Sequence, residues 1–435
     1  MGYSSGFNSN IKTAVVGAGD YGSGLIFQIM ETDEVEINLL VDNKIEKARN
    51  LLLKAGIDKE DIVHTSNQKK LNNTIKNKKI VIAENINLVP EAPVEVVVDC
   101  TGNIEAGAKL AYNSIFKGKH IVEVNVEMDV VVGPILSSMA QNAGVVYTTA
   151  DGDQPSLAAG MVEWARNIGL EVIMAGKGTS LYTEEQYQTR LEKDPDISWS
   201  TVAYLDGTKS QIEMASIANI TGLIPNKTGM HKPRVTLEEA VEIFSEKNKD
   251  QGVLNQRGVV DLVNCIAPDG KKIIEPRLAN GVFVVVTASN SHSLQLMKNK
   301  GVIMSKDNER ALLYRPHHLC GIETLTSIRK AQNLRMPTGA PRGKPVAEVV
   351  AVAKKDLSQG KKLDGLGGET VKGIIYTASE AERENYLPVG LANKVVLAED
   401  VAKGEPITKD MLKKPGDSFA WKLRAVQEEI LEPEI

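Results

Sequence analysis

Short apolar runs alternate with amphipathic stretches over the first 150 residues. Apolar runs of this length predict buried parallel strands, and apolar residues at helical spacing predict helices that cover them. The predicted strands are 14–16, 35–41, 94–99, 120–124 and 145–149, with helices over 45–55, 105–116 and 134–143; residues 56–92 show no clear pattern. This alternation predicts an α/β fold with a doubly wound parallel sheet over residues 11–150.

A glycine-rich loop follows the first predicted strand. It contains Gly17, Gly19, Asp20, Tyr21 and Gly22 and reads G-x-G-x-x-G. In a dinucleotide-binding unit, the first glycine allows a tight turn, the second lets backbone approach a pyrophosphate, and the third lets helix pack on strand. The pyrophosphate then lies at the helix N-terminus, where unpaired N–H groups favour negative charge. We therefore expect residues 11–150 to bind NAD(P).

Asp42 lies at the end of the second strand, twenty residues after Gly22. An acid at this spacing is expected to accept the ribose hydroxyls of NAD. The same carboxylate would repel the 2′-phosphate of NADP, whereas Asn43, Lys44 and Arg49 could offset that repulsion. The choice between NAD and NADP stays open at this point.

Two further loops are candidates for cofactor contact because they follow predicted strands of the same sheet. Thr101 and Gly102 follow the strand 94–99, where the nicotinamide half of a dinucleotide is expected. Asn125 and Glu127 follow the strand 120–124. For Glu127, a favourable charge at the start of a helix explains the residue almost as well.

The pattern changes at residue 151. Pro155 suits the first turn of a helix, and strands are predicted at 171–175, 258–264, 281–287 and 312–314, with helices at 208–215 and 322–332. Residues 151–335 are expected to form an α+β domain that supplies the substrate site and a dimer surface. Residues 337–343 read as a linker, and short strands with tight turns predict a small all-β domain over 345–415.

Composition excludes several classes of function. The net charge of -5 argues against a nucleic-acid-binding protein, which would be expected to carry an excess of basic residues. Three widely spaced cysteines give neither a disulfide framework nor metal-ligand spacing, which predicts a reducing compartment and no structural metal site. No apolar run reaches the length of a membrane span. We expect a cytoplasmic enzyme that acts on a small molecule and assembles as a homo-oligomer.

Several separated motifs resemble a known superfamily. They are residues 118–122, 133–134, 143–145, 124–127, 152–155, 175–179, 206–210 and 314–318, together with 353–357 and 387–392 near the C-terminus. The first three resemble the homoserine dehydrogenase nucleotide domain, and the next five resemble 1-deoxy-D-xylulose 5-phosphate reductoisomerase-like proteins. The last two resemble the SAF (β-clip) domain that ends such proteins. Homoserine dehydrogenases carry Ala-Asn-Lys where this chain has Val124-Asn125-Val126, so the missing lysine argues against homoserine as substrate.

Lys177 is the first candidate for the chemical step. It follows the predicted strand 171–175 and lies in a loop between Gly176 and Gly178, which leave room for close approach. A partly desolvated lysine can polarise a carbonyl or, with a lowered pKa, move a proton. The alternative is an ordinary lysine of a surface turn.

Other candidates are polar residues of the same domain. Lys209 and Glu213 lie four residues apart on a predicted helix and hence on one face. The two could form a proton relay, bind substrate hydroxyls or make an ordinary surface ion pair. Asp153 precedes Pro155 and either contacts ligand or caps the helix. His318 is the preferred general acid of the pair 317–318, with Arg315 as an alternative anion ligand.

These observations predict an NAD(P)-dependent oxidoreductase for a small polyhydroxy carbonyl compound, either a sugar acid or a sugar phosphate. The resemblance implies that an α-ketol rearrangement can accompany hydride transfer. The alternatives are homoserine dehydrogenase and, in another class, a non-catalytic regulatory protein that binds dinucleotide. Intact Lys177, Lys209 and Glu213 argue against the regulatory alternative.

Overall fold

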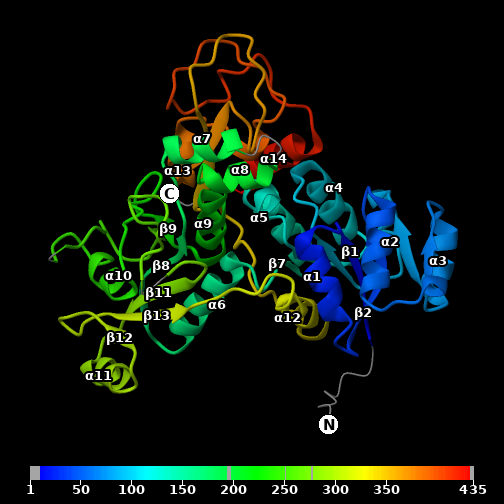
Figure 1. The fold of residues 1–435 in the computed structure, drawn as a ribbon, viewed down its shortest axis with the longest axis horizontal. Helices are drawn as coiled ribbons and strands as arrows, with labels where there is room; N and C mark the ends of the chain where they lie inside the picture. Colours follow the sequence, from blue (N-terminus) through cyan, green and yellow to red (C-terminus); the bar gives the residue numbers. More distant parts are fainter. Residues whose placement is uncertain (1–9, 194–196, 250, 276–277, 432–435) are drawn as a thin grey trace. The chain divides into compact units, whose positions relative to one another are not determined.

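The computed structural model describes residues 10–193, 197–249, 251–275 and 278–431 (Figure 1). The chain divides into two compact units. The first consists of residues up to 156 together with 319–343, and the second of residues 157–318 together with 344 onward. Each predicted sheet is present, but the sheet of the predicted C-terminal domain belongs to the second unit. The division into three domains stays a prediction.

The first unit is built on a seven-stranded sheet in the order β3-β4-β2-β1-β5-β6-β7, and every strand pair in it is parallel. This is the Rossmann order with one additional edge strand, which confirms the predicted fold class. The strands are β1 (Ile11–Val16), β2 (Val35–Val41), β3 (Ile62–His64), β4 (Ile80–Ala83), β5 (Val96–Asp99), β6 (His120–Glu123) and β7 (Tyr147–Thr149).

Helices cover both faces of this sheet because each carries an apolar stripe. They are α1 (Asp20–Ile29), α2 (Ile45–Lys54), α3 (Gln68–Lys76), α4 (Ile104–Ile115), α5 (Val126–Asn142), α12 (Thr324–Arg329) and the short turns η1 (Lys59–Asp61), η2 (Ile86–Leu88) and η3 (Lys330–Leu334). Leu25, Ile26 and Ile29 of α1 are buried in the same core as Leu325 and Ile328 of α12. The chain therefore returns to the first unit to complete its core.

A six-stranded mixed sheet forms the centre of the second unit, in the order β12-β13-β11-β8-β10-β9. The strands are β8 (Glu171–Thr179), β9 (Ile224–Pro225), β10 (Val259–Asn264), β11 (Val282–Thr287), β12 (Ile303–Met304) and β13 (Ala311–Arg315). The helices before β14 are α6 (Gln154–Asn167), which starts in the first unit, then α7 (Glu184–Lys193), α8 (Trp199–Leu205), α9 (Thr208–Thr221), α10 (Leu237–Ile243) and α11 (Ser291–Asn299).

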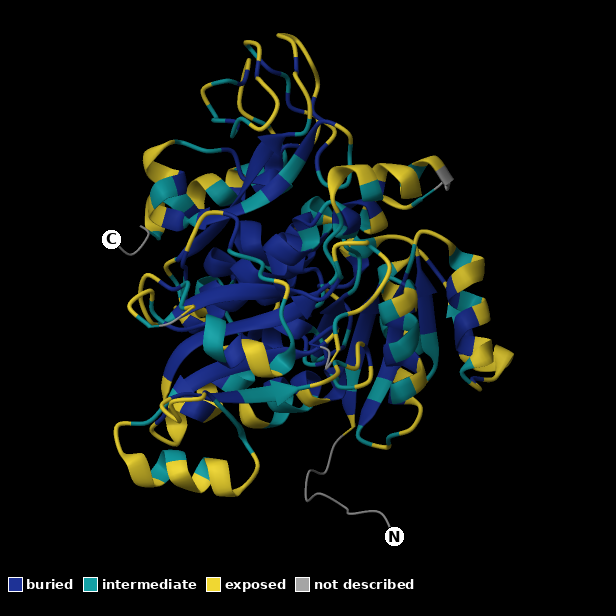
Figure 2. Cartoon of the chain, turned by 60° about the vertical axis from the view of Figure 1, so that its left-hand side comes forward, coloured by how far each residue is buried: buried dark blue, intermediate teal, exposed yellow. Residues whose placement is uncertain are grey.

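Helix α9 is buried over nearly its whole length, as Figure 2 shows for the dark core of this unit. One side contacts β8 and β10 of the mixed sheet, and the other contacts the antiparallel pair β14 (Ala347–Ala353) and β15 (Val371–Thr377). On the second side, the Gln211 side chain accepts a hydrogen bond from the Ile375 N–H at 3.0 Å. The helix thus joins the two sheets of this unit.

The C-terminal part consists of β14, β15 and short bridged segments, followed by a helix. It also contains α13 (Ala378–Arg383), η4 (Val389–Leu391) and α14 (Phe419–Ile430). Its short strands agree with the predicted all-β character, apart from these helices. Its assignment as a SAF domain stays a prediction.

Several predicted boundaries differ from the structure, and two of the differences bear on the site. Helix α5 begins at Val126, eight residues before Pro134, because the Asn125 side chain caps it by accepting from the Met128 N–H at 3.2 Å. Strand β8 continues through residue 179, so Lys177 lies in a strand and not in a loop. The prediction places the end of the strand at a glycine and the start of the helix at a proline. The observed strand and helix continue through that residue because they are packed on both sides.

Candidate functional site

The glycine-rich loop has the geometry that a dinucleotide needs. A Cβ at Gly17 would lie 2.5 Å from the Cys100 carbonyl oxygen, and one at Gly22 would lie 2.1 Å from the Gly17 oxygen. These two positions therefore require glycine for close packing. At Gly19 no atom lies within 4 Å of such a Cβ, and no side chain caps α1. The open glycine and the uncapped first turn fit a pyrophosphate.

Asp42 has a role in this loop that the sequence did not reveal. Its Oδ2 accepts from the Ala18 N–H at 2.7 Å, and its Oδ1 accepts from the Lys44 N–H at 2.8 Å. The carboxylate therefore holds the loop after β1 against the end of β2. It retains lone pairs for a ribose hydroxyl, and its part in selecting NAD or NADP stays a prediction.

Asp20 and Tyr21 begin α1, but their environments differ. Asp20 is exposed, whereas the Tyr21 hydroxyl lies 2.8 Å from the Thr324 hydroxyl and 3.4 Å from the Asp151 carbonyl oxygen. Burial raises the pKa of Tyr21 well above its ordinary value. The Tyr21 hydroxyl thus ties α1 to α12 within the first unit, and direct cofactor contact by either residue stays a prediction.

Asn125 is a positioning residue in this geometry. Its side chain is buried and donates to the Asn103 carbonyl oxygen at 3.0 Å, in addition to capping α5. It thereby holds the loop that carries Thr101 and Gly102, both half-buried. Glu127 is buried in the first turn of α5. These hydrogen bonds of Asn125 go to protein groups, and direct cofactor contact by Asn125 and Glu127 stays a prediction.

A pair of buried acids lies at the same edge of the sheet. Glu123 and Asp99 are fully buried at the ends of β6 and β5, which are hydrogen-bonded neighbours. Burial raises the pKa of both carboxyl groups, and in Glu123 the nearby Asp99 raises it further. Among the described residues, the Glu123 Oε2 atom has no hydrogen-bond partner. Burial and the neighbouring Asp99 thus favour the neutral form of Glu123.

In the second unit, Lys177 and Glu213 form a buried ion pair. The Lys177 side chain is 3% exposed and that of Glu213 is 8% exposed, with Nζ contacting Oε2. Lys177 projects from β8, and Glu213 comes from the second turn of α9, which packs on that strand. A surface-turn role for Lys177 is thus excluded, and so is a surface pairing for Glu213.

The two glycines beside Lys177 are required for a different reason from the one the sequence suggests. A Cβ at Gly176 would lie 2.0 Å from the Asp261 carbonyl oxygen, and one at Gly178 would lie 2.0 Å from that of Leu278. Neighbouring backbone therefore demands glycine at both positions. The sequence pattern predicts that these glycines leave room for close approach to Lys177, whereas contacts with neighbouring backbone explain them.

Other predicted residues lie around the same end of β8. Lys209 is half-buried one turn before Glu213, and next to it Ser210 shares a 3.1 Å hydrogen bond with Thr179 at the end of β8. His318 Nδ1 lies 2.8 Å from the Asn280 carbonyl oxygen, just before β11. Residue 282 of β11 pairs with both Lys177 and Arg315. The strand register therefore places the predicted groups from α9, β8 and the end of β13 at one end of the sheet.

Asp153 belongs to the first unit, next to the start of α6. Its Oδ1 accepts from the Gln154 N–H at 2.8 Å. This contact agrees with the helix-entry alternative, and ligand contact stays a prediction.

Sequence reasoning missed one polar arrangement beside Lys177. Asp261 lies on β10 next to Leu262, which pairs with Lys177, and its Oδ2 lies 2.6 Å from His231 Nδ1. His231 is in the loop after edge strand β9. His231 lies thirty residues from Asp261, so no local sequence pattern predicts that they meet. The Gly-Met-His-Lys-Pro segment is the one sequence feature that could have drawn attention to this histidine.

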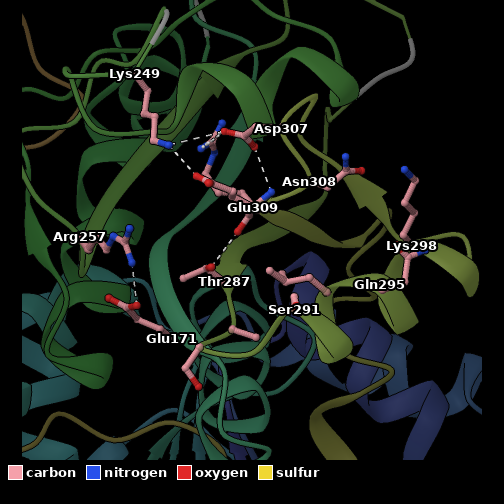
Figure 3. Close-up of a pocket in the computed structure, with 14 residues that line it drawn as sticks. Glu171, Lys249, Arg257, Thr287, Ser291, Gln295, Lys298, Asp307, Asn308 and Glu309 are labelled. Carbon is pink, nitrogen blue, oxygen red and sulfur yellow. Dashed lines mark hydrogen bonds and ion pairs between the residues drawn. The ribbon is translucent and has the colours of Figure 1, made fainter.

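A cavity of about 600 Å³ lies at the opposite end of β8 (Figure 3). Its wall contains Glu171 and Arg257, 2.7 Å apart, and Lys249 and Glu309, 2.6 Å apart. These half-exposed charges are mutually paired, and none of the predicted catalytic residues lines the cavity. The described residues contain no cluster of metal-ligand side chains and no helix long and apolar enough to cross a bilayer.

Comparison with known proteins places an enzyme domain over this region. A family model described as "Oxidoreductase DRL, catalytic domain" matches residues 152–324, which include Lys177, Glu213, His231 and His318. A search of curated proteins finds no match.

Solved dehydrogenases and a reductoisomerase align with parts of this chain at low similarity. A probable dehydrogenase from Thermotoga maritima is 12% identical, with a TM-score of 0.42 over 77% of this chain and 92% of that chain. A 1-deoxy-D-xylulose 5-phosphate reductoisomerase from Zymomonas mobilis is 16% identical, with a TM-score of 0.37 over 48% of this chain and 58% of that chain. A myo-inositol dehydrogenase from Corynebacterium glutamicum is 12% identical, with a TM-score of 0.36 over 64% and 73%. At this identity the likeness concerns the fold alone.

The matched catalytic domain, together with the Rossmann sheet and its glycine-rich loop, identifies the chain as an NAD(P)-dependent oxidoreductase. The predicted enzyme class and cofactor are thereby confirmed.

Proposed function

We propose that the enzyme reduces or oxidises a small polyhydroxy carbonyl compound, either a sugar acid or a sugar phosphate, and that Lys177 polarises the carbonyl. The observation that carries this proposal is the buried Lys177–Glu213 pair inside the matched oxidoreductase domain. A buried charge pair costs desolvation energy and is weak evidence for stability alone. A buried lysine near the end of a strand, next to other polar groups, supports a role in chemistry.

The nicotinamide, when bound, donates or accepts the hydride. In the reducing direction, the Lys177 ammonium donates a hydrogen bond to the carbonyl oxygen and stabilises the negative charge that develops there. The proton of that ammonium then passes to the oxygen, while hydride adds to the carbonyl carbon. Glu213 keeps the lysine oriented, and a proton taken up from solvent restores the Lys177 ammonium after the reaction. His318 is a second proton donor at this end of the sheet.

An α-ketol rearrangement before reduction needs a second anchor for the neighbouring hydroxyl. Thr179, Ser210 and Lys209 supply hydroxyl and ammonium groups next to Lys177 along β8 and α9. These polar groups support the rearrangement as an optional first step of the same reaction. Homoserine lacks the α-ketol that such anchors would hold.

The test is a binding measurement followed by a substrate panel. NADH and NADPH binding is measured by fluorescence, and NAD(P)H oxidation is then followed with sugar acids, sugar phosphates and homoserine. The Lys177→Met variant should lose at least about 1000-fold in turnover and retain cofactor affinity. Lys298→Met, at an exposed position on α11, is the matched control and should keep full activity.

The outcomes separate the alternatives. Turnover on one panel member that disappears in Lys177→Met supports the proposal. Cofactor binding without turnover on any member favours the non-catalytic regulatory alternative. Turnover that survives in Lys177→Met refutes the role of this lysine, and loss of cofactor affinity in the variant would do the same.

A further inference from the structure

We propose that the loop over residues 226–234, together with Lys372 of β15, is an anion site that holds a phosphate group of the substrate. This inference rests on the proposed function, since it assigns the phosphorylated members of the proposed substrate class to the enzyme. It concerns a segment that carries none of the predicted catalytic residues.

The loop is held in a conformation that its residues do not favour. Met230 and Lys232 have φ values of 65° and 56°, in the left-handed region that costs a non-glycine residue about 1 kcal/mol or more. Both lie next to His231. Backbone strain of this kind persists only where the surroundings impose it, and it is concentrated at functional sites.

The buried Asp261 carboxylate imposes this conformation. It accepts from the backbone N–H of His231 at 3.1 Å and of Lys232 at 3.3 Å, and from His231 Nδ1 at 2.6 Å. With Nδ1–H donated to the carboxylate, the ring is fixed and Nε2 is its remaining polar atom. A ring that carries hydrogen on both nitrogens would donate its Nε2–H to a bound anion.

The loop also lies against β15. The Gly229 N–H donates to the Ile375 carbonyl oxygen at 2.9 Å, and a Cβ at Gly229 would lie 3.4 Å from the Ile374 side chain and 3.9 Å from Lys232 Nζ. Lys372 lies two residues before Ile374 on a regular strand, so both side chains project from the same face. Lys372 therefore points toward the loop that carries Lys232.

The loop and β15 together carry three lysines, Lys227, Lys232 and Lys372, near the Asp261 carboxylate. Burial lowers the pKa of Lys232, and Lys372 and Lys227 lower it further, which places the three positive charges in each other's field. Among the described residues, none of these lysines has a carboxylate within 4 Å. Glu184 also lies in the field of Lys372 but forms an ion pair with Lys403 at 2.9 Å. A doubly charged phosphate matches this excess better than a single carboxylate.

The proposed anion site and Lys177 lie in the same unit, on elements next to one another. Asp261 pairs with Gly176, the residue before Lys177, so the Asp261 and Lys177 side chains start from neighbouring positions on opposite faces of the sheet. On α9, Thr208 accepts from the Gly373 N–H beside Lys372, and Glu213 follows five residues later, about 7.5 Å along the helix.

The experiment measures binding of inorganic phosphate, which does not require turnover. Dissociation constants are determined by calorimetry for the full chain and for Lys232→Gln, Lys372→Met and the control Lys298→Met. We expect each of the first two substitutions to weaken phosphate binding at least about 10-fold, as expected for loss of one charge-assisted contact, and the control to leave it unchanged. Lys372→Met lies on a regular strand, so it tests the site even if the loop variant fails to fold.

Several results would overturn the inference. They are absence of phosphate binding, equal weakening in the Lys298→Met control, and acetate binding that the variants lose while phosphate binding stays unchanged. Turnover is a separate measurement: with an active phosphorylated substrate, both variants should raise KM about 10-fold and change kcat less. Phosphate binding that the variants lose, without turnover on any panel member, supports the anion site and counts against the proposed function.

Discussion

Glu123 and Glu213 are both buried glutamates next to a strand end, yet their surroundings are opposite. Glu213 contacts the Lys177 ammonium inside the second unit. Glu123 lies beside Asp99 in the first unit, and no described Lys, Arg or His forms an ion pair with it. Burial alone favours the neutral acid, whereas an adjacent cation favours the carboxylate. The same residue type thus serves as one half of an ion pair in one sheet and as a neutral group in the other.

This difference in surroundings suggests which glutamate takes part in the reaction and which one supports the fold. A charge that is kept in a dry environment beside a cation can act on a substrate, because both partners interact strongly there. Glu123 accepts from the Asn125 N–H at 2.9 Å at the end of β6, so we expect it to support the fold. The comparison predicts that substitutions around Glu213 change activity and that substitutions of Glu123 change stability.

Removing the cation should have the largest effect. Lys177→Met leaves Glu213 buried without its partner, which is expected to lower the free energy of unfolding by about 3–5 kcal/mol. The double variant Lys177→Met/Glu213→Leu removes both charges and should recover most of that loss, while turnover stays absent. Chemical denaturation of both variants measures this. If the single variant is as stable as the parent, the pair does not depend on charge compensation.

Removing the negative charge should have the next largest effect. Glu213→Gln keeps the shape and a hydrogen-bond acceptor but no longer orients a charged lysine strongly, so we expect kcat to fall about 10- to 100-fold. The pH profile of kcat should shift as well, because a charged neighbour of Lys177 is lost. An unchanged profile with unchanged kcat would assign Glu213 to structure alone.

Glu123→Gln should act on stability, in a pH-dependent way. The pKa of Glu123 is raised in the folded state, so the folded protein binds more protons than the unfolded chain between the unfolded and folded pKa values. The free energy of unfolding therefore falls as pH rises through that window. The Gln variant avoids this loss and should be more stable by about 1–3 kcal/mol at pH 8, with little difference near pH 4.

The exposed Glu31→Gln in the same unit is the control for this measurement and should change stability at neither pH. Thermal or chemical unfolding at the two pH values checks the prediction. A Glu123→Gln variant that is less stable at pH 8 would mean that the carboxyl is charged when folded.

The smallest effect is expected at the paired charges of Figure 3. Arg257 lies 2.7 Å from Glu171 and 2.6 Å from Glu246, but its side chain is 41% exposed. Solvent screens such pairs, so Arg257→Ala should cost less than about 1 kcal/mol and leave kcat unchanged. A large loss of activity would move the chemistry to this end of β8.

The sequence by itself determined the first sheet in most of its detail. Buried strands such as 14–16 and 35–41, the glycine spacing at Gly17, Gly19 and Gly22, and Asp42 follow from local patterns. Each of these strands buries both faces, and Gly17 and Gly22 each meet a nearby backbone. Lys177, Glu213 and His318 were also found, since strand ends, helical spacing and family motifs point to them.

Only the tertiary structure decided how those residues are paired. Lys209 and Glu213 looked like partners because they are four apart, but Glu213 contacts Lys177, thirty-six residues away on a strand that α9 packs against. His231 and Asp261 meet because the loop after β9 returns to the side of β10. Local spacing defines which side chains share a face, whereas contacts between elements depend on packing across the whole unit, and these contacts set charge state and chemistry.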